Sequence, residues 1–216
     1  MCGRFALASS PQAMAEYLQG DVPDSFVSRY NIAPTTPVLA KISSGITFLR
    51  WGLIPSWSKD MVIGNRLFNA RSETILQKPS FKNAFKRRRC LIPASGFYEW
   101  HLESGIKQPY FCHIDKALFS FAGIWEHWQD AQGNELHSCA ILTTQAVGEL
   151  AGIHQRMPVV IRDELHNDWL NHANESTQAA LDCISQLNSE FHIYPVSTMV
   201  NASRNDSAEL INPVKT

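Results

Sequence analysis

Short alternations of apolar and polar residues make up most of the chain. Runs of this kind, bounded by Gly, Pro, Asn or Asp, predict β-strands with one buried face. Short turns such as Glu103-Ser104-Gly105 and Asp115-Lys116 join several of them, which predicts antiparallel hairpins. The predicted strands cover residues 36–42, 46–51, 89–94, 97–101, 110–114, 118–124, 137–143, 157–161 and 191–196.

Helical periodicity is confined to a few segments, at residues 10–20, 80–87, 145–151 and, most clearly, 163–187. In the first segment Ser10 can cap the helix, Pro11 suits its first turn, and Gly20 can end it. Strands and helices do not alternate along the chain, which favours an α+β fold with a coiled antiparallel sheet over a parallel sheet. No repeat, low-complexity stretch or linker divides the sequence, so we expect a single domain over residues 1–216.

Composition places the chain among ordinary globular proteins. Charged residues make up 18% and hydrophobic residues 44% of its 216 residues. The sequence has neither an apolar run of about 18 residues nor the long apolar core of a signal peptide. We therefore expect no membrane partner and a cytoplasmic location.

The net charge of −1 conceals an uneven distribution. Residues 50–89 contain ten Lys or Arg and two Asp or Glu, whereas residues 90–216 contain six and fifteen. If these charges are not scattered in the fold, one face is strongly basic and suits a polyanion such as nucleic acid. The residues that could extend such a face, or could instead form a solvated helix end, are Lys82, Lys86, Arg87, Arg88 and Arg89.

The cysteine and histidine patterns exclude several classes of protein. Five widely spaced cysteines without a C-x-x-C pair argue against a disulfide framework and against a zinc ribbon. The eight histidines form no H-E-x-x-H motif or paired Cys/His spacing, so we predict no metal and no cofactor. Four of the cysteines are expected to be small buried side chains, namely Cys90, Cys112, Cys139 and Cys183.

Cys2 differs from the other cysteines because it follows the initiator methionine. Removal of Met1, which we expect before a small residue, would leave an α-amine and a thiol on adjacent carbons of Cys2. Their reference pKa values are about 7.7–8 and about 8.5, so a useful fraction of each is nucleophilic near neutral pH. The amine can form a Schiff base with an aldehyde, and the thiol can then close a five-membered thiazolidine ring.

Three polar segments could supply acid–base or anion-binding groups. Asn69 and Arg71 would share one face of a strand. Glu99 stands among aromatic residues, where desolvation would raise its pKa and suit it to general acid catalysis. His154 and Arg156 are two residues apart among apolar neighbours. Simpler interpretations remain open: a turn cap for Asn69, a surface ion pair for Glu99 and a structural role for His154.

Taken together, the sequence resembles the SRAP (SOS-response-associated peptidase) family, whose members shield abasic sites. The resemblance runs in order through almost the whole chain. Its motifs are MCGR at 1–4, YNIAPT at 30–35, WGLIPSW at 51–57, NARSET at 69–74, RRCLIPASGFYEW at 88–100, QPY at 108–110, FAGIWE at 121–126, IHQRMPVVI at 153–161, PVS at 195–197 and LINP at 210–213.

The resemblance implies a fold of coiled, mainly antiparallel, barrel-like β-sheets with a few peripheral helices. It also implies that Cys2 cross-links to abasic sites in single-stranded DNA, while Glu99 and His154 act as acid/base groups and Asn69 positions the Cys2 amine or the sugar. Phosphate ligands would be Arg4, Arg71 and Arg156, which offer fork-shaped donors. Weaker candidates along the path of the strand are Asn31, Pro34, Trp57 and Thr143. We expect a monomer.

Two other functions stay open at this stage. The first is an N-terminal-nucleophile cysteine peptidase, in which the Cys2 thiolate attacks a peptide carbonyl and the α-amine is the base; its only event could be removal of Met1. The second is a non-catalytic single-stranded DNA binder, which would need Arg71 and Arg156 but neither Cys2 nor Glu99. An abasic-site lyase activity, which starts from the same Schiff base, could accompany cross-linking.

Overall fold

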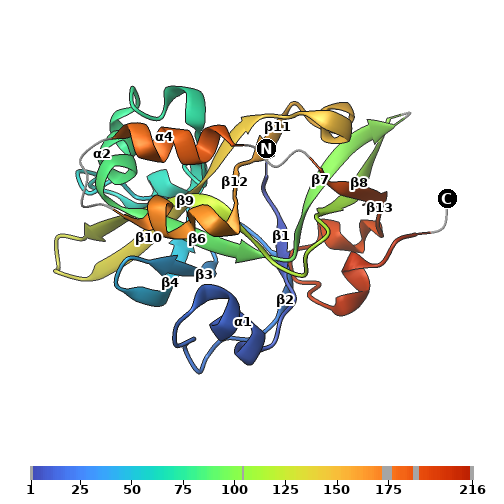
Figure 1. Ribbon diagram of the computed structural model, residues 1–216, viewed down its shortest axis with the longest axis horizontal. Helices are drawn as coiled ribbons and strands as arrows, with labels where there is room; N and C mark the ends of the chain where they lie inside the picture. The colour runs from blue at the N-terminus through green and yellow to red at the C-terminus, as the bar shows by residue number, and fades with distance from the viewer. Residues whose placement is uncertain (1, 104, 172–176, 187–189, 215–216) are drawn as a thin grey trace.

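A computed structural model describes residues 2–103, 105–171, 177–186 and 190–214. Its larger sheet has eight strands, five of which close into a barrel (Figure 1). The ring is formed by β3 (Pro37–Ile42), β4 (Gly45–Trp51), β10 (Glu135–Gln145), β9 (Phe119–Gln129) and β6 (Arg89–Ala94), which pairs again with β3. The strands β5 (Asn69–Arg71), β11 (Arg156–Pro158) and β12 (Val160–Ile161) extend the sheet.

Most pairings in this sheet are antiparallel, and two are parallel. Strand β10 runs parallel to β4, with Ser138 opposite Arg50, and parallel to β5, with Ile141 opposite Asn69. The barrel-like, mainly antiparallel α+β fold predicted from the sequence is therefore confirmed. Closure also removes the exposed edges that an open sheet of this size would carry.

The second sheet is entirely antiparallel and carries the N-terminus. Its strand order is β13 (His192–Pro195), β8 (Ile106–His113), β7 (Gly96–Glu103), β1 (Phe5–Leu7) and β2 (Arg29–Ile32). Phe5 of β1 packs edge-to-face on Trp51 at 5.3 Å and on Phe121 at 5.6 Å between ring centroids. Because both partners belong to the barrel, Phe5 joins the two sheets in one core.

Helices are short and lie at the periphery. They are α1 (Pro11–Leu18), α2 (Pro79–Arg87), α3 (His166–Leu170) and α4 (Thr177–Ser185). Ser10 Oγ accepts the N–H of Ala13 at 3.2 Å and Pro11 opens α1, as predicted, whereas left-handed Gln19 ends it just before Gly20. The 3₁₀ turns are η1 (Met61–Arg66), η2 (Ser72–Thr74), η3 (Gly148–Gly152), η4 (Asp163–Leu165), η5 (Thr198–Asn201) and η6 (Ala208–Ile211).

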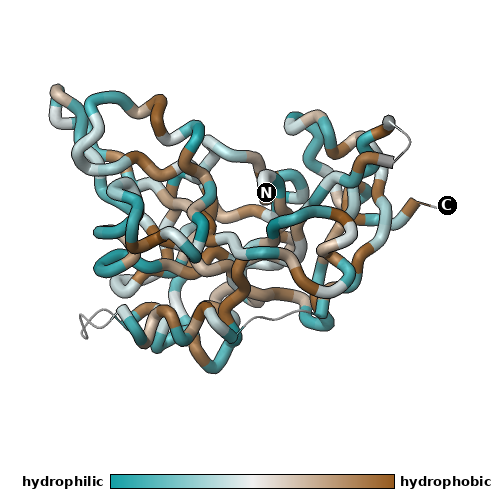
Figure 2. The backbone as a smooth tube through the Cα atoms, turned by 90° about the horizontal axis from the view of Figure 1, so that it is seen from above, coloured by the Kyte–Doolittle hydropathy of each residue, from teal (hydrophilic) through white to brown (hydrophobic). Residues whose placement is uncertain are grey.

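Figure 2 shows apolar stretches running through the interior of the molecule and hydrophilic ones gathering in the outer loops. All four cysteines predicted to be buried are so, and none of the five cysteines forms a disulfide. No helix among the described residues is long and apolar enough to cross a membrane.

The long helix predicted over residues 163–187 is wrong. Within the described part of this range, the turn η4 and helix α3 end before Asn171, which has extended backbone angles, and α4 is a separate helix; residues 172–176 and 187 lie outside the described residues. Arg89 explains where α3 ends, because its guanidinium donates to the main-chain oxygens of Trp169 and Asn171. Carbonyl groups at the end of a helix need outside donors, and Arg89 supplies them.

Two further local predictions are wrong because tertiary pairing overrides them. The helix predicted over residues 145–151 is replaced by the end of β10, where Gln145 pairs with Arg156, followed by the turn η3. Asp115-Lys116 joins β8 of one sheet to β9 of the other, so these strands form no hairpin. The predicted β7–β8 hairpin is confirmed, since Glu103 is paired with Ile106, while Ser104 of its turn lies outside the described residues.

Gly96 is required where β7 passes Phe111. A Cβ atom at this position would lie 2.1 Å from Phe111 Cζ, and Phe111 is itself packed on Tyr98. We expect Gly96→Ala to lower the free energy of unfolding by about 3 kcal/mol, because the ring cannot move without disrupting its neighbours. Urea denaturation measures this. Gly152→Ala, where a Cβ meets nothing within 4 Å, is the control; equal losses for both variants would contradict the packing argument.

Candidate functional site

Pairing between β1 and β7 places the start of the chain beside Glu99. Phe5 lies opposite Phe97, and the N–H of Tyr98 donates to the main-chain oxygen of Arg4 at 2.9 Å. Continued by two residues, this antiparallel register brings Gly3 opposite Glu99. The segment entering β1 is directed toward the region between β7 and β11 (Figure 1). Cys2, just ahead of it, is completely buried.

Asn69 reaches the same point from the barrel sheet. It is the first residue of β5, and its Nδ2 donates to the main-chain oxygen of Cys2 at 2.7 Å. Its Oδ1 is buried and accepts no hydrogen bond from the described residues. The Asn69 side chain therefore fixes the Cys2 main chain and presents a second polar atom within the site.

Glu99 is the buried acid of the site, with 3% of its surface exposed. Burial raises its pKa to about 7, because the apolar surroundings disfavour the charged form. Both protonation states of Glu99 are thus well populated near neutral pH. A carboxyl group in this condition can donate a proton in one step and accept one in the next.

His154 approaches from the loop between η3 and β11. Its Nδ1 lies 2.9 Å from the main-chain nitrogen and 3.1 Å from the main-chain oxygen of Arg156, and these contacts orient the ring. Burial lowers the pKa of His154, which favours the neutral imidazole. His101 of β7 lies 3.4 Å, measured from Nδ1, from the main-chain oxygen of Ile153. This contact ties the strand that carries Glu99 to the loop that carries His154.

The Cys2 thiol is held in its protonated form. Burial raises its pKa, and the negative charge of Glu99 raises it further. A thiol in this state is a poor first nucleophile. Removal of its proton therefore requires a neighbouring base, and the carboxylate of Glu99 is within electrostatic reach.

Two of the predicted phosphate ligands are half-buried and already hydrogen-bonded. Arg4 Nη1 donates to Asn31 Oδ1 at 2.7 Å and to the main-chain oxygen of Val200 at 2.8 Å, and its guanidinium lies 6.0 Å from the ring centre of Trp100. Arg156 donates through Nη1 and Nη2 to the two oxygens of Glu73 at 2.6 and 2.9 Å.

Arg71 is exposed at the end of β5, and its neighbour across the sheet is Thr143. The main-chain oxygen of Thr143 accepts from Arg156 Nη2 at 2.7 Å. Strands β5, β10 and β11 thus bring Asn69, Arg71 and Arg156 to one region of the barrel sheet, although Arg156 is 85 positions after Arg71 in the sequence.

The weaker candidates fall into two groups. Asn31 and Thr143 are buried, and each contacts one of the arginines rather than facing outward. The Nδ2 of Asn31 also donates to three main-chain oxygens of residues 200–205. Their interior positions suit them to hold Arg4 and Arg156 in place.

Pro34 and Trp57 are the more accessible pair. Trp57 is 59% exposed, and Pro34 is partly exposed. Thr35, after Pro34, has φ of 74°, an uncommon value for a β-branched residue. Its N–H donates to the main-chain oxygen of Trp51 at 2.7 Å, which holds this strained turn against the barrel.

The basic stretch at the end of α2 does not act as one exposed track. Arg89 is 2% exposed, and its guanidinium donates hydrogen bonds to main-chain oxygens. Arg88 forms an ion pair with Glu126 at 2.7 Å. The expectation that Arg89 extends an electrostatic surface is therefore wrong. Lys86 and Arg87 lie in the last turn of α2, where positive charge suits the helix dipole.

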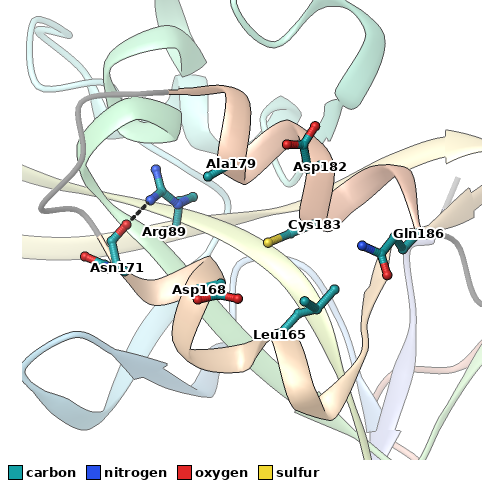
Figure 3. Close-up of a pocket in the computed structure, with 8 residues that line it drawn as sticks. All are labelled: Arg89, Leu165, Asp168, Asn171, Ala179, Asp182, Cys183 and Gln186. Carbon is teal, nitrogen blue, oxygen red and sulfur yellow. Dashed lines mark hydrogen bonds between the residues drawn. The ribbon is translucent and has the colours of Figure 1, made fainter.

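Arg89 instead borders a pocket of about 300 Å³ between α3 and α4 (Figure 3). Its other walls include Asp168, Asp182 and Cys183. None of the predicted site residues lines this pocket. Among the described ranges, no three His, Cys, Asp or Glu side chains are grouped as metal ligands.

Sequence reasoning missed Glu73 and Trp100, which contact Arg156 and Arg4 respectively. Both stand inside motifs of the family resemblance, Glu73 in NARSET and Trp100 in GFYEW. The signal that could have found Glu73 is an acid two residues from a candidate phosphate ligand. Its actual partner lies 83 residues away and is fixed only by the fold.

Fold and site together define an α+β barrel protein with a buried cysteine at position 2 and a buried carboxyl group of raised pKa. The chain belongs to the SOS response associated peptidase (SRAP) family, whose model matches residues 1–203. The chain is 39% identical to the abasic site processing protein YoqW of Bacillus subtilis (strain 168), over 98% of this chain and 99% of that relative. It is 35% identical to the abasic site processing protein HMCES of Rattus norvegicus, over 88% and 66% respectively.

Solved structures carry the same fold. A protein from Bacteroides thetaiotaomicron superposes with a TM-score of 0.87, covering 99% of this chain and 100% of that chain at 24% identity. A phage-related protein from Bordetella bronchiseptica is 33% identical, with a TM-score of 0.72 and coverage of 90% and 94%.

Proposed function

We propose that this chain processes abasic sites in single-stranded DNA by linking to them covalently through Cys2, and so shields them. The observation that carries the proposal is the Asn69 hydrogen bond that fixes Cys2 beside the buried Glu99. Relatives named abasic site processing proteins support the choice of substrate. The exposed Trp57 and the arginines fit a strand whose bases are open to stacking.

The chemistry begins once Met1 has been removed. An abasic deoxyribose in its open form carries an aldehyde at C1′, and the Cys2 amine adds to that carbon. Loss of one water gives a protonated imine. The Cys2 sulfur then adds to the same carbon, the thiol proton leaves, and the nitrogen keeps its remaining hydrogen in a neutral thiazolidine ring. The overall reaction joins protein and DNA and releases one water.

Glu99 and His154 divide the proton transfers. Protonated Glu99 is suited to donate to the departing hydroxyl group, and the resulting carboxylate is suited to take the proton of the Cys2 thiol. The neutral imidazole of His154 is suited to hydrogen-bond a sugar hydroxyl group while the ring opens. In a competing branch, loss of a C2′ proton from the imine expels the 3′ phosphate, which is a lyase reaction.

The peptidase alternative has less support. The raised pKa of the Cys2 thiol suits a reaction in which the α-amine attacks first, whereas a cysteine peptidase needs a thiolate as its first nucleophile. Removal of Met1 by the chain itself remains compatible with the site, because that bond is adjacent to Cys2. A purely non-covalent binder would not need a carboxyl group of raised pKa near Cys2.

The test uses protein whose loss of Met1 is verified by intact mass. It is incubated with a single-stranded oligonucleotide that carries one abasic site, and the products are separated on a denaturing gel after heating. A shifted band supports the proposal. No band from fully processed protein would overturn it, and steady cleavage of a peptide insensitive to abasic DNA would favour the peptidase.

Asn69→Ala is expected to slow adduct formation about 100-fold without abolishing it. The variant loses the 2.7 Å contact to the Cys2 main chain, so the amine is no longer held toward the sugar. Initial rates of adduct formation measure the effect, and Asn65→Ala, which removes an exposed contact to Arg50, serves as the control. Wild-type rates for Asn69→Ala would contradict the positioning role.

A further inference from the structure

The guanidinium of Arg156 already binds an anionic side chain of the same protein, the carboxylate of Glu73. Its Nη1 and Nη2 donate to the two carboxylate oxygens of Glu73 at 2.6 and 2.9 Å, a bidentate ion pair. Two parallel donors of this kind are the arrangement with which arginine binds the oxygens of a phosphate. Glu73 therefore stands where a DNA phosphate would bind Arg156.

The two partners of this ion pair are held very differently. The Arg156 side chain is 16% exposed, and its Nη2 also donates to the main-chain oxygen of Thr143 at 2.7 Å. The Glu73 side chain is 47% exposed and belongs to the three-residue turn η2. Arg156 thus keeps its place if the pair opens, whereas Glu73 can turn into solvent.

Glu73 is also within electrostatic reach of Arg71, the second proposed phosphate ligand of this region. Its pKa is lowered by the hydrogen bond from Arg156 and, to a smaller extent, by the positive charge of Arg71. The carboxylate is consequently ionised at neutral pH. Its negative charge offsets part of the positive potential that the two arginines would offer to a strand.

We propose that Glu73 is an internal competitor for DNA phosphate at Arg156, and that it sets the affinity and salt dependence of strand binding. This inference rests on the proposed function. An undamaged strand must displace Glu73 from Arg156 each time it binds, and this cost weakens its binding. A strand that becomes linked to Cys2 stays at the site, and its phosphate displaces Glu73 for the lifetime of the link. The competitor thereby shortens the residence of undamaged strands, while a strand that is already linked to Cys2 is retained by its covalent bond.

The test compares wild type with Glu73→Gln for binding of a dye-labelled, undamaged single-stranded oligonucleotide, measured by fluorescence anisotropy. The neutral amide is a weaker partner for Arg156, so we expect about tenfold tighter binding. The slope of log affinity against log salt should steepen by about 0.7, the value for one added phosphate contact on a single strand. Glu73→Ala should act in the same direction.

Two controls isolate the role of Arg156. Glu164→Gln removes the same charge from an exposed ion pair with Arg162, 2.8 Å long, and should change affinity less than twofold. Adding Arg156→Ala to Glu73→Gln should erase the gain, because the phosphate then has no guanidinium to reach.

Weaker or unchanged binding by Glu73→Gln and Glu73→Ala would overturn the inference and assign Glu73 to holding Arg156 in place. The proposed function would survive that result, provided that the wild type still forms the heat-stable adduct. A wild type that neither binds strands nor forms adduct would instead overturn both.

Discussion

Replacing Cys2 by alanine is expected to lower the yield of heat-stable adduct at least 100-fold. The variant still offers an α-amine after Met1 is removed, so the imine with the sugar aldehyde can form. Without a thiol, however, no ring closes, and heating in water returns the imine to amine and aldehyde. The denaturing gel described above measures the loss.

Reduction with borohydride separates the two steps. It converts an imine into a stable amine, so Cys2→Ala treated during the reaction should give a band comparable to that of wild type. Cys183→Ala, which removes another buried thiol distant in sequence and lining the α3–α4 pocket, should behave as wild type without reduction. A heat-stable, unreduced adduct from Cys2→Ala would sink the thiazolidine mechanism.

Glu99→Gln is expected to slow adduct formation about 100-fold near neutral pH and to change the shape of the pH profile. The pKa of Glu99 is raised from its ordinary 4.5 to about 7, so the protonated acid is lost only as the pH rises through about 7. The attacking α-amine, with a reference pKa of about 7.7–8, becomes nucleophilic over a similar range. The wild-type rate should therefore pass through a maximum between the two values.

In Glu99→Gln the falling limb should vanish, because glutamine does not ionise, while the rising limb set by the amine remains. Single-turnover rates between about pH 5.5 and pH 9 test this. Thermal unfolding of each variant at every pH distinguishes a catalytic effect from loss of the fold. A profile for Glu99→Gln that keeps the wild-type maximum would assign the falling limb to another group and remove Glu99 from the proton transfers.

Local pattern predicted the β7–β8 hairpin, because side-chain alternation reports on burial, but it could not show that Asp115-Lys116 connects two different sheets. It missed β1 and β2, which are too short for any periodicity and are defined by their pairing with distant strands. Barrel closure likewise depends on the parallel pairing of β4 with β10, two strands that are far apart in the sequence. The prediction of one helix over residues 163–187 is wrong because the Arg89 guanidinium donates to the main-chain oxygen of Trp169 and so caps the end of α3.

In the candidate site too, local sequence predicted some features, while others depend on the fold. Motifs indicated Cys2, Asn69, Glu99 and His154, and the fold gives a direct contact between the first two. Burial could not be foreseen for Asn31 and Thr143, whose polar side chains suggested contact with a ligand. The partner of Arg156 could not be predicted either. Arg156 and Glu73 are 83 residues apart, and neither local sequence indicates that the fold brings them together in an ion pair.

The hydrogen bond from Asn69 to Cys2 also constrains how a gene for this protein can be built. Any purification tag, reporter fusion or leader left at the N-terminus would convert the Cys2 amine to an amide and would bring added chain into a completely buried position. Expression vectors should therefore supply a start codon directly before the cysteine codon, with any tag at the opposite end. For the same reason, the proposed chemistry requires a mature chain that begins at Cys2.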